Sequence, residues 1–233
     1  MVNSNSKILI FMCDDRCVYE ENYIKYSYLI NRRYVKKHYY RFAFYNLNKD
    51  KNKHSAWSKI DLSIDLINDT DYDLYVYLDS DCIFNKQDIS LYQYLSNAKY
   101  CKTHSNPDIL FLKDSIGLCF PCSGFFIFNR KALEIFIDWK SNFSDDEKIF
   151  FRKHPWEQKI LQNRYNKYAL SIIDDNHFGM NTNNFIIHLA ARSTKYRLEK
   201  FKEYYLNTCK EELTPFDEVF NTNENSQDYF SSW

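Results

Sequence analysis

Asp79 and Asp81 follow directly on the apolar stretch LYVYL and are the side chains in this sequence best placed to do chemistry. In open α/β sheets, ligands bind beyond the carboxyl ends of the strands, which is where these two carboxylates fall. Carboxylates two residues apart can point the same way, and a divalent cation relieves their mutual repulsion. Oxygen ligands favour Mg²⁺ or Mn²⁺, which can also bridge the oxygens of a diphosphate. The alternative is an ordinary aspartate turn after a buried strand.

Three more aspartates, Asp69, Asp71 and Asp73, precede the same stretch. They belong to a helix-to-strand connection, and at ~3.3 Å per residue they lie roughly 17 Å from the far end of the strand. We therefore expect them to be solvated turn residues.

The elements that must position Asp79 and Asp81 alternate between apolar runs, which predict strands, and stretches with apolar residues at helical spacing, which predict helices. Ser55 is the expected N-cap of the second helix. The order argues for an α/β domain with a mainly parallel sheet. The five expected elements are a strand at 7–13, a helix at 20–38, a strand at 41–47, a helix at 55–68 and a strand at 74–78.

Beyond Phe84 the pattern is mixed. Residues 1–210 are expected to form one domain, and the acidic, aperiodic stretch 211–233 is expected to be a tail or a lid. The expected helices are 89–96, 132–143, 155–168 and 194–207, and the expected strands are 108–114, 124–129, 168–174 and 184–190.

The composition limits the classes of partner. Lys plus Arg and Asp plus Glu both total 31, so no basic field attracts nucleic acid or anionic lipid nonspecifically. No apolar run approaches the ~18 residues of a membrane span, and none is flanked like a secretory signal. We therefore expect no transmembrane segment and a cytoplasmic location. The abundance of Asn, Lys and Ile suggests A+T-rich coding DNA, as in a large DNA virus or a parasite.

The cysteines are expected to be reduced thiols, because seven cysteines without a secretory signal do not suggest a disulfide framework. The stretches CDDRC (Cys13, Cys17) and CFPC (Cys119, Cys122) could make a four-thiolate zinc site, but buried reduced cysteine is the commoner outcome.

Several segments together resemble one family. The segment WSKIDLSIDLINDTDYDLYVYLDSDCIF is similar to that of the Golgi galactosyl- and mannosyltransferases of glycosyltransferase family 34, which include plant xyloglucan xylosyltransferases. There, Trp-x-Lys begins a helix and an apolar strand ends in Asp-x-Asp. RRYVKKHYYRFAFYN resembles the family's helix-to-strand passage, and CSGFFIFNR, WEQKIL and FIIHLAARS resemble its Asn-Thr-Gly strand, its acidic-Gln helix start and its metal-binding His segment. The segments run in the family's order from Lys7 to Arg197.

The resemblance implies a GT-A fold, a single Rossmann-like domain with helices on the sheet, which binds a sugar nucleotide with Mn²⁺ (or Mg²⁺). Asp79 and Asp81 would bind the metal and the ribose-diphosphate, and His188 would complete the metal ligands. The implied donor pocket comprises Cys13, Asp14, Trp57, Lys59, Asp79, Ser80, Ser123, Gly124 and Arg192.

Simpler interpretations exist for these residues. His188 could be a core histidine, Trp57 a core tryptophan and Lys59 a solvated lysine. Cys13 and Asp14 could be turn residues.

The sequence also departs from the family pattern. The family's Gly after His38 is Tyr39, its Asn-Thr-Gly is the sequence Cys-Ser-Gly ending at Gly124, and its Gly-Cys-Lys has become Ala-Arg-Ser from Ala191. Arg192, or Lys195 a turn later, could replace the family's lysine as the cation beside the leaving phosphate.

Together with these residues, the resemblance implies a metal-dependent glycosyltransferase that moves a hexose or a pentose from a nucleotide sugar, with UDP-sugars favoured, to a hydroxyl acceptor such as a glycan. The resemblance also implies retention of configuration, with the amide of Gln158 close to the reacting centre. Glu157 could instead act as a general base in an inverting enzyme, because carboxylates fill either role. Glu157 also suits the first turn of a helix without any catalytic role.

Two other functions remain open. A haloacid-dehalogenase-type phosphohydrolase would use Asp79, Asp81, Asp174 and Asp175 as its nucleophile and Mg²⁺ ligands, but it gives no role to Lys59 or His188. A non-catalytic module that binds carbohydrate or nucleotide is the other alternative.

Overall fold

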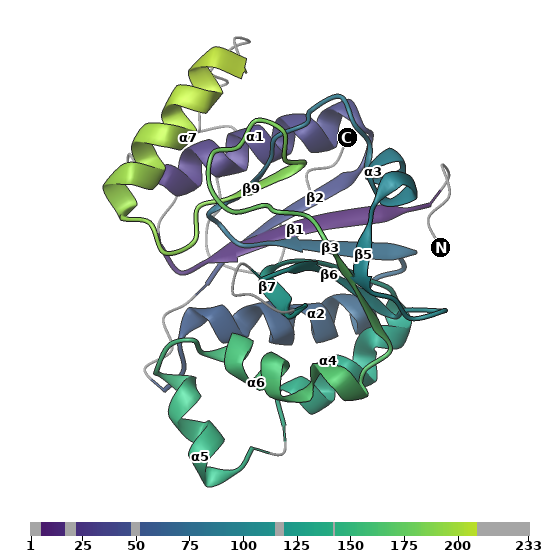
Figure 1. Cartoon of the computed structure of the whole chain (residues 1–233). Helices are drawn as coiled ribbons and strands as arrows, with labels where there is room; N and C mark the ends of the chain where they lie inside the picture. Colours follow the sequence, from purple (N-terminus) through teal and green to yellow (C-terminus); the bar gives the residue numbers. More distant parts are fainter. Residues whose placement is uncertain (1–5, 17–21, 48–51, 115–118, 142, 209–233) are drawn as a thin grey trace.

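The computed structural model describes residues 6–16, 22–47, 52–114, 119–141 and 143–208. A seven-stranded sheet with the order β2-β1-β3-β7-β6-β8-β5 lies at its centre (Figure 1). β1, β2, β3, β6 and β8 run in one direction, and β7 and β5 run in the other. The predicted mainly parallel sheet is therefore confirmed. The strands are β1 (Ile8–Asp14), β2 (Arg41–Asn46), β3 (Leu74–Leu78), β5 (Tyr100–Lys102), β6 (Ile109–Lys113), β7 (Pro121–Phe128) and β8 (Leu170–Ile173).

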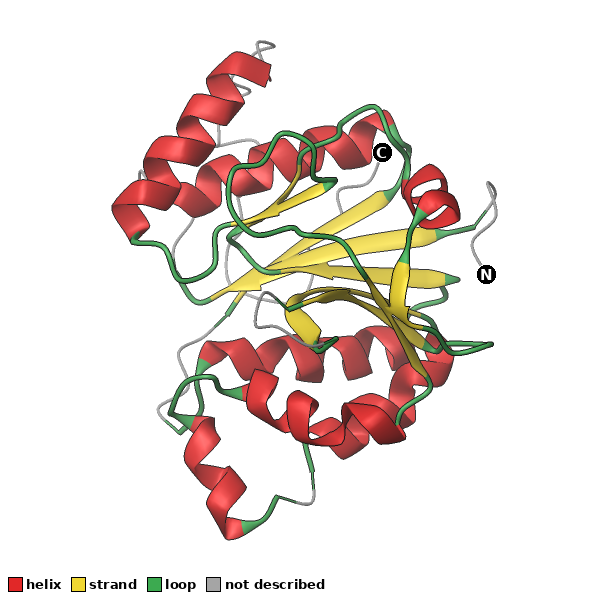
Figure 2. Cartoon of the chain, in the orientation of Figure 1, coloured by secondary structure: helices red, strands yellow, loops and turns green. Residues whose placement is uncertain are grey.

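Helices cover both faces of the sheet (Figure 2). On one face α1 packs against α7, and on the other α2 packs against α4, which in turn contacts α6. The bounds are α1 (Tyr23–Lys37), α2 (Ser58–Asp69), α3 (Leu91–Asn97), α4 (Leu133–Trp139), α5 (Asp145–Lys148), α6 (Glu157–Arg164) and α7 (Thr194–Thr208).

The strands separate two hydrophobic cores. Alternate residues of β1 enter different cores, with Ile10 and Met12 on the side of α1 and Leu9 and Phe11 on the side of α2. Because both faces of the sheet are covered, the central strands β1, β3 and β7 are buried along their whole length, which explains why they could be recognised as largely apolar runs.

A second, two-stranded sheet lies beside the main one. β4 (Cys82–Phe84) pairs antiparallel with β9 (Ile186–His188), and Cys82 lies opposite His188. Asn31 of α1 anchors this ribbon, because its amide donates to the Cys82 carbonyl at 2.9 Å and its side-chain oxygen accepts from the N–H of Phe84 at 2.9 Å. The pairing brings a segment more than a hundred residues away in sequence to the turn after β3.

Some predicted boundaries differ from the structure. Ser55 is not the N-cap of α2: residues 55–57 form a 3₁₀ turn, the ring of His54 accepts the N–H of Ala56, and α2 begins at Ser58. α1 begins at Tyr23, with Asn22 as its N-cap. The short elements β4, β5 and α5 were not predicted, because each has too few residues to show a periodic pattern.

The expectation of reduced cysteines is wrong for one pair. Cys101, at the edge strand β5, and Cys119 form a disulfide, with Cα atoms 5.8 Å apart. A four-thiolate zinc site that includes Cys119 is therefore excluded, and Cys17, its fourth candidate ligand, lies outside the described residues. Cys13, Cys82 and Cys122 are buried free thiols.

Two other expectations concern the ends of the chain and the membrane. The predicted tail or lid at 211–233 lies outside the described residues. Within the described ranges, no helix has the length and apolar character that a bilayer span requires.

Candidate active site

A cavity of about 350 Å³ opens where β1 and β3 end. Ligands in α/β sheets bind at this edge. The aspartates before β3 lie elsewhere, and the side chain of Asp71 is 91% exposed beside Arg130. The residues predicted from the sequence that line the cavity are Cys13, Asp14, Asp79, Ser80 and Asp81.

The turn that carries Asp79 and Asp81 is fixed by its backbone. The N–H of Asp79 donates to the carbonyl of Gly124 on β7 at 2.8 Å, and the N–H of Cys82 donates back to the carbonyl of Asp79 at 2.9 Å. Ser27 of α1 donates its hydroxyl to the carbonyl of Ser80 at 2.6 Å. The main sheet and α1 therefore set the direction of both carboxylates.

Asp81 contacts two cationic or ionisable partners. Its Oδ1 lies 3.2 Å from Nε2 of His188, and its Oδ2 lies 2.8 Å from Nη2 of Arg197 on α7. Burial alone would raise the pKa of Asp81, but His188 and Arg197 outweigh it and lower this pKa to about 2. Asp81 is therefore ionised at neutral pH.

Asp79 is held by a buried lysine. Lys59 Nζ donates to Asp79 Oδ1 at 2.7 Å and lies 3.1 Å from Glu157 Oε1, and the hydroxyl of Tyr77 donates to the same Asp79 oxygen at 2.6 Å. Burial alone would lower the pKa of Lys59, but the charges of Asp79 and Glu157 raise it. Lys59 is therefore a charged residue in the interior beneath Asp79, and neither a solvated lysine nor part of the cavity wall.

Glu157 and Gln158 lie behind the cavity, at the start of α6, and hold β7. Glu157 is 3% exposed, and its Oε1 accepts the hydroxyl of Ser123 at 2.8 Å. Gln158 accepts the N–H of Ser123 at 2.6 Å and donates to the carbonyl of Pro121 at 2.6 Å. Burial raises the pKa of Glu157, while Lys59 opposes that rise. Neither side chain lines the cavity.

Asp14 forms a small polar network at the end of β1. Its carboxylate accepts from the guanidinium of Arg16 at 2.5 Å and from the hydroxyl of Ser80 at 2.5 Å. This links the end of β1 to the Asp79–Asp81 turn. Next to it, burial raises the pKa of the Cys13 thiol to about 12, which leaves that thiol neutral.

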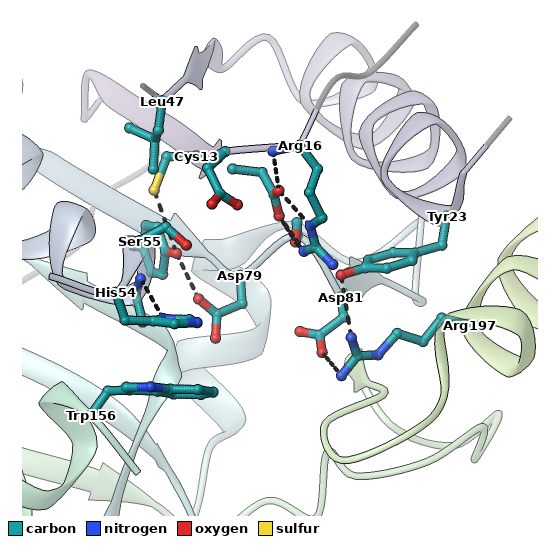
Figure 3. A pocket seen from close by; sticks show the side chains of 15 residues that line it. Cys13, Arg16, Tyr23, Leu47, His54, Ser55, Asp79, Asp81, Trp156 and Arg197 are labelled. Carbon is teal, nitrogen blue, oxygen red and sulfur yellow. Dashed lines mark hydrogen bonds and ion pairs between the residues drawn. The ribbon is translucent and has the colours of Figure 1, made fainter. Parts of the chain in front are cut away.

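The two sides of the cavity differ in character. Figure 3 shows the rings of His54 and Trp156 on one side and Arg16, Tyr23 and Arg197 on the other, with the aspartates between them. His54 and Trp156 stack with ring centroids 3.9 Å apart, and both guanidinium groups lie over the ring of Tyr23, at 4.9 and 5.2 Å. One side is thus aromatic and the other cationic.

Trp156 owes its position to an unusual backbone. Its φ is 49°, in the left-handed region that residues other than glycine seldom adopt. Such conformations persist only where the surrounding structure enforces them, and they cluster at functional sites.

Several predicted residues lie outside the cavity lining. Trp57 is fully buried, and its indole donates to the carbonyl of Phe150 at 3.2 Å. Arg192 is exposed, with its guanidinium over the ring of Tyr196, and the side chain of Lys195 is 86% exposed. The cation that reaches the cavity from this part of the chain is Arg197.

The sequence reasoning did not assign Arg16, Tyr23, His54, Trp156 or Arg197. Arg16 could have been found, because it follows the first strand at the ligand-binding edge. Trp156 precedes the Glu-Gln pair already singled out. No local sequence pattern points to Arg197, because its position at the cavity depends on how α7 packs against the rest of the protein.

The donor atoms fit a divalent cation. Asp81 Oδ1 and His188 Nε2 are 3.2 Å apart, a separation that adjacent ligands of one ion also have at Mn–ligand distances of about 2.2 Å. Carboxylate oxygens with one imidazole suit Mn²⁺. Asp81, Cys82 and His188 together offer ligand atoms within 4.8 Å of one another.

The haloacid-dehalogenase arrangement does not form. β8, which precedes Asp174, is separated from β3 by β7 and β6. Asp174 accepts from Lys113 at 2.9 Å, and Asp175 accepts from the hydroxyl of Tyr94 at 2.8 Å. Neither residue lines the cavity with Asp79.

No protein-family model matches the chain, and no curated protein is significantly similar to it in sequence. Solved structures are similar in fold. A glycosyltransferase involved in the glycosylation of the major capsid of PBCV-1 is 15% identical with a TM-score of 0.68, over 84% of this chain and 99% of that chain. The chain has a GT-A glycosyltransferase fold.

Two further structures with this GT-A fold are less similar. The glycosyltransferase GlyE of Streptococcus pneumoniae TIGR4 is 13% identical with a TM-score of 0.51, over 87% of this chain and 61% of that chain. An active-site mutant of LgtC is 13% identical with a TM-score of 0.51, over 86% of this chain and 95% of that chain. The expected GT-A fold is confirmed, and the resemblance to glycosyltransferase family 34 stays a prediction.

Proposed function

We propose that this protein is a metal-dependent glycosyltransferase that moves a hexose or a pentose from a nucleotide sugar, with UDP-sugars favoured, to a hydroxyl of an acceptor such as a glycan. The observation that carries the proposal is the cavity at the carboxyl edge of a GT-A sheet, where Asp79 and Asp81 lie beside two arginines. A pair of carboxylates suits a cation, and a pair of arginines suits the phosphates that the cation accompanies.

In this proposal Asp79, Asp81 and His188 hold Mn²⁺ or Mg²⁺. When bound, the ion supplies a Lewis acid that stabilises the charge on the leaving nucleoside diphosphate. Lys59 fixes the position of Asp79 from below through a 2.7 Å contact. Lys59 and Tyr77 together leave Asp79 little rotational freedom, so its carboxylate is oriented before the donor binds.

Arg16 and Arg197 are the proposed contacts of the diphosphate. Both guanidinium groups already line the cavity, each paired with a carboxylate, Asp14 or Asp81. Arg197 lies 2.8 Å from Asp81 at the cavity wall, so its guanidinium would be within reach of a phosphate that accompanies a cation at this carboxylate. Preorganised positive charge at the leaving group lowers the barrier of such a transfer.

The aromatic side formed by His54 and Trp156 is the proposed border of the transferred sugar and the acceptor. An inverting enzyme needs a base that reaches the acceptor hydroxyl. Glu157 is committed to Lys59 and Ser123 in the interior, so we assign it and Gln158 a positioning role and favour retention of configuration.

Calorimetry with UDP- and GDP-sugars, with and without Mn²⁺, tests the proposal. We expect one class of donor to bind the wild type, more tightly with Mn²⁺, and to lose most of this affinity in Asp81→Asn. Asp71→Asn is the matched control, since that exposed aspartate precedes the same strand, and it should bind as the wild type does. If no sugar nucleotide binds the folded wild type under any of these conditions, the proposal is wrong.

A further inference from the structure

A second group of metal-ligating side chains lies in the interior behind the Asp79–Asp81 turn. Cys122 on β7, His177 in the connection after β8, and His188 on β9 are all buried. Their ligand atoms lie within 4.8 Å of one another. None of the three lines the cavity, so this cluster is separate from the proposed diphosphate contacts.

The two ring nitrogens of His188 face different partners. Nε2 lies 3.2 Å from Asp81 Oδ1, and Nδ1 lies 3.9 Å from the sulfur of Cys122. Gly124 keeps the ring in this place, because a Cβ at that position would be 2.4 Å from His188 Cε1. A nitrogen that faces a thiol while its opposite nitrogen faces a carboxylate is oriented for ligation.

His177 has a ring nitrogen in need of a partner. Its ring stacks with that of His188 at 5.5 Å between centroids, with 14° between the planes. Nδ1 lies 3.4 Å from the carbonyl of Asp175. Nε2 is buried, and among the described residues it has no hydrogen-bond partner. Buried polar atoms are almost always satisfied, so an unsatisfied nitrogen beside a thiol and a second imidazole calls for an explanation.

We propose that Cys122 Sγ, His177 Nε2 and His188 Nδ1 bind a zinc ion. One thiolate and two imidazoles form a nitrogen and sulfur ligand set that favours Zn²⁺ over Mn²⁺ or Mg²⁺. The other nitrogen of each histidine faces an oxygen, the Asp81 carboxylate or the Asp175 carbonyl, as in known carboxylate–histidine–zinc arrangements. Three protein ligands leave the fourth tetrahedral position for a water molecule.

This ion would connect three segments that meet next to the donor site. It joins β7 to β9 and to the connection that contains His177. The backbone already pairs these last two segments, since the N–H of His188 donates to the carbonyl of His177 at 2.8 Å. With Nδ1 of His188 on the zinc, the ring proton lies on Nε2, which donates to Asp81. Zinc-bound His188 would therefore orient Asp81 and would not itself be a ligand of the exchangeable cation, which Asp79 and Asp81 would hold. In this respect zinc binding changes the role that the proposed function gives to His188.

Metal analysis of the full chain tests this inference. We expect the wild type, purified from zinc-supplemented cells, to retain about one zinc per chain. Cys122→Ala and His177→Ala should lose it to background. Cys13→Ala, which removes another buried thiol, and Asp79→Asn, which removes a donor-site carboxylate, should keep it. In the wild type reconstituted with Co²⁺, a thiolate-to-cobalt charge-transfer band should appear, and it should be absent in Cys122→Ser.

Two results would overturn the inference. One is a folded wild type that retains no zinc and gives no thiolate–cobalt band, a result that does not depend on whether any variant folds. The other is zinc that is lost in Asp79→Asn and kept in a folded Cys122→Ala, which would place the ion at the donor site. Near-ultraviolet circular dichroism of each variant shows whether it is folded.

Discussion

Lys59 Nζ lies 2.7 Å from Asp79 Oδ1 in the interior of the protein, and this contact ties the helix α2 to the turn that carries the candidate metal ligands. The same nitrogen lies 3.1 Å from Glu157 Oε1. One buried cation thus balances two carboxylates from different elements, and it fixes the carboxylate that faces the cavity.

Replacing Lys59 should lower the free energy of unfolding of the protein. Lys59→Met leaves Asp79 and Glu157 without their cation, and breaking a buried ion pair typically costs about 3–5 kcal/mol. Denaturant unfolding measures the change. Lys148→Met, which removes an exposed pair with Asp145, should change stability by less than about 0.5 kcal/mol. A double variant, Lys59→Met with Glu157→Gln, should recover part of the loss, and equal stability of Lys59→Met and the wild type would contradict the role of the buried pair.

Arg197, and not Arg192, should be the cation needed for catalysis. Arg197→Ala is expected to lower kcat/KM for the donor by about 10²- to 10³-fold, the usual loss when one charge-stabilising group is removed. Arg192→Ala should stay close to the wild type, because that side chain is exposed and outside the cavity. Steady-state kinetics with a nucleotide-sugar donor measures both variants. A larger loss of kcat/KM in Arg192→Ala than in Arg197→Ala would contradict our assignment.

Gly124 should not tolerate a side chain. A Cβ there would lie 2.4 Å from His188 Cε1, so Gly124→Ala must displace the imidazole, at a cost of about 1–3 kcal/mol. Donor affinity should fall with it, since the ring faces Asp81. Gly179→Ala is the comparison: its φ of 80° is strained for alanine, but no atom lies within 4 Å of the added Cβ. That variant should lose some stability and keep donor affinity, and a Gly124→Ala protein with unchanged donor affinity would argue against the assigned position of His188.

Stability should fall in acid partly through Asp138. Burial alone would raise the pKa of Asp138, but hydrogen bonds from Lys167 and Tyr168 outweigh it and lower this pKa. A lowered pKa in the folded state means that the contribution is present above the unfolded value of about 4 and is lost as the pH falls through the folded value. Unfolding curves from pH 6 down to roughly pH 2 should therefore be less pH-dependent in Asp138→Asn than in the wild type. Asp145→Asn, at a 95% exposed carboxylate, should match the wild type, and identical curves for Asp138→Asn would contradict the assignment.

The main strands, and the position of Asp79 and Asp81 at the ligand-binding edge of the sheet, could be predicted from the sequence. A continuous apolar run followed by polar residues is a local pattern, and the edge at which ligands bind follows from strand direction. His188 was identified only through the resemblance, because the pairing of β4 with β9 that brings it to Asp81 joins two three-residue strands distant in the chain.

Lys59 and Arg197 show why the rest could not be predicted. A lysine among the polar residues of an amphipathic helix is expected to be solvated, yet Lys59 is buried because its partners come from the turn after β3 and from α6. Arg192 was chosen because it stands in the segment where the resembling family has its Gly-Cys-Lys, as a replacement for that lysine. Ala191, with a φ of 57°, turns the chain there, so the residue that returns to the cavity is one turn into α7.

The most direct test of the central claim is donor turnover. Release of nucleoside diphosphate from UDP- and GDP-sugars should be measured with oligosaccharide acceptors, with and without Mn²⁺, for the wild type, Asp81→Asn and Asp71→Asn. We predict that the wild type and Asp71→Asn turn over one class of donor only with a divalent cation, and that Asp81→Asn is slower by about 10²-fold or more. Turnover by Asp81→Asn at the wild-type rate would contradict the account.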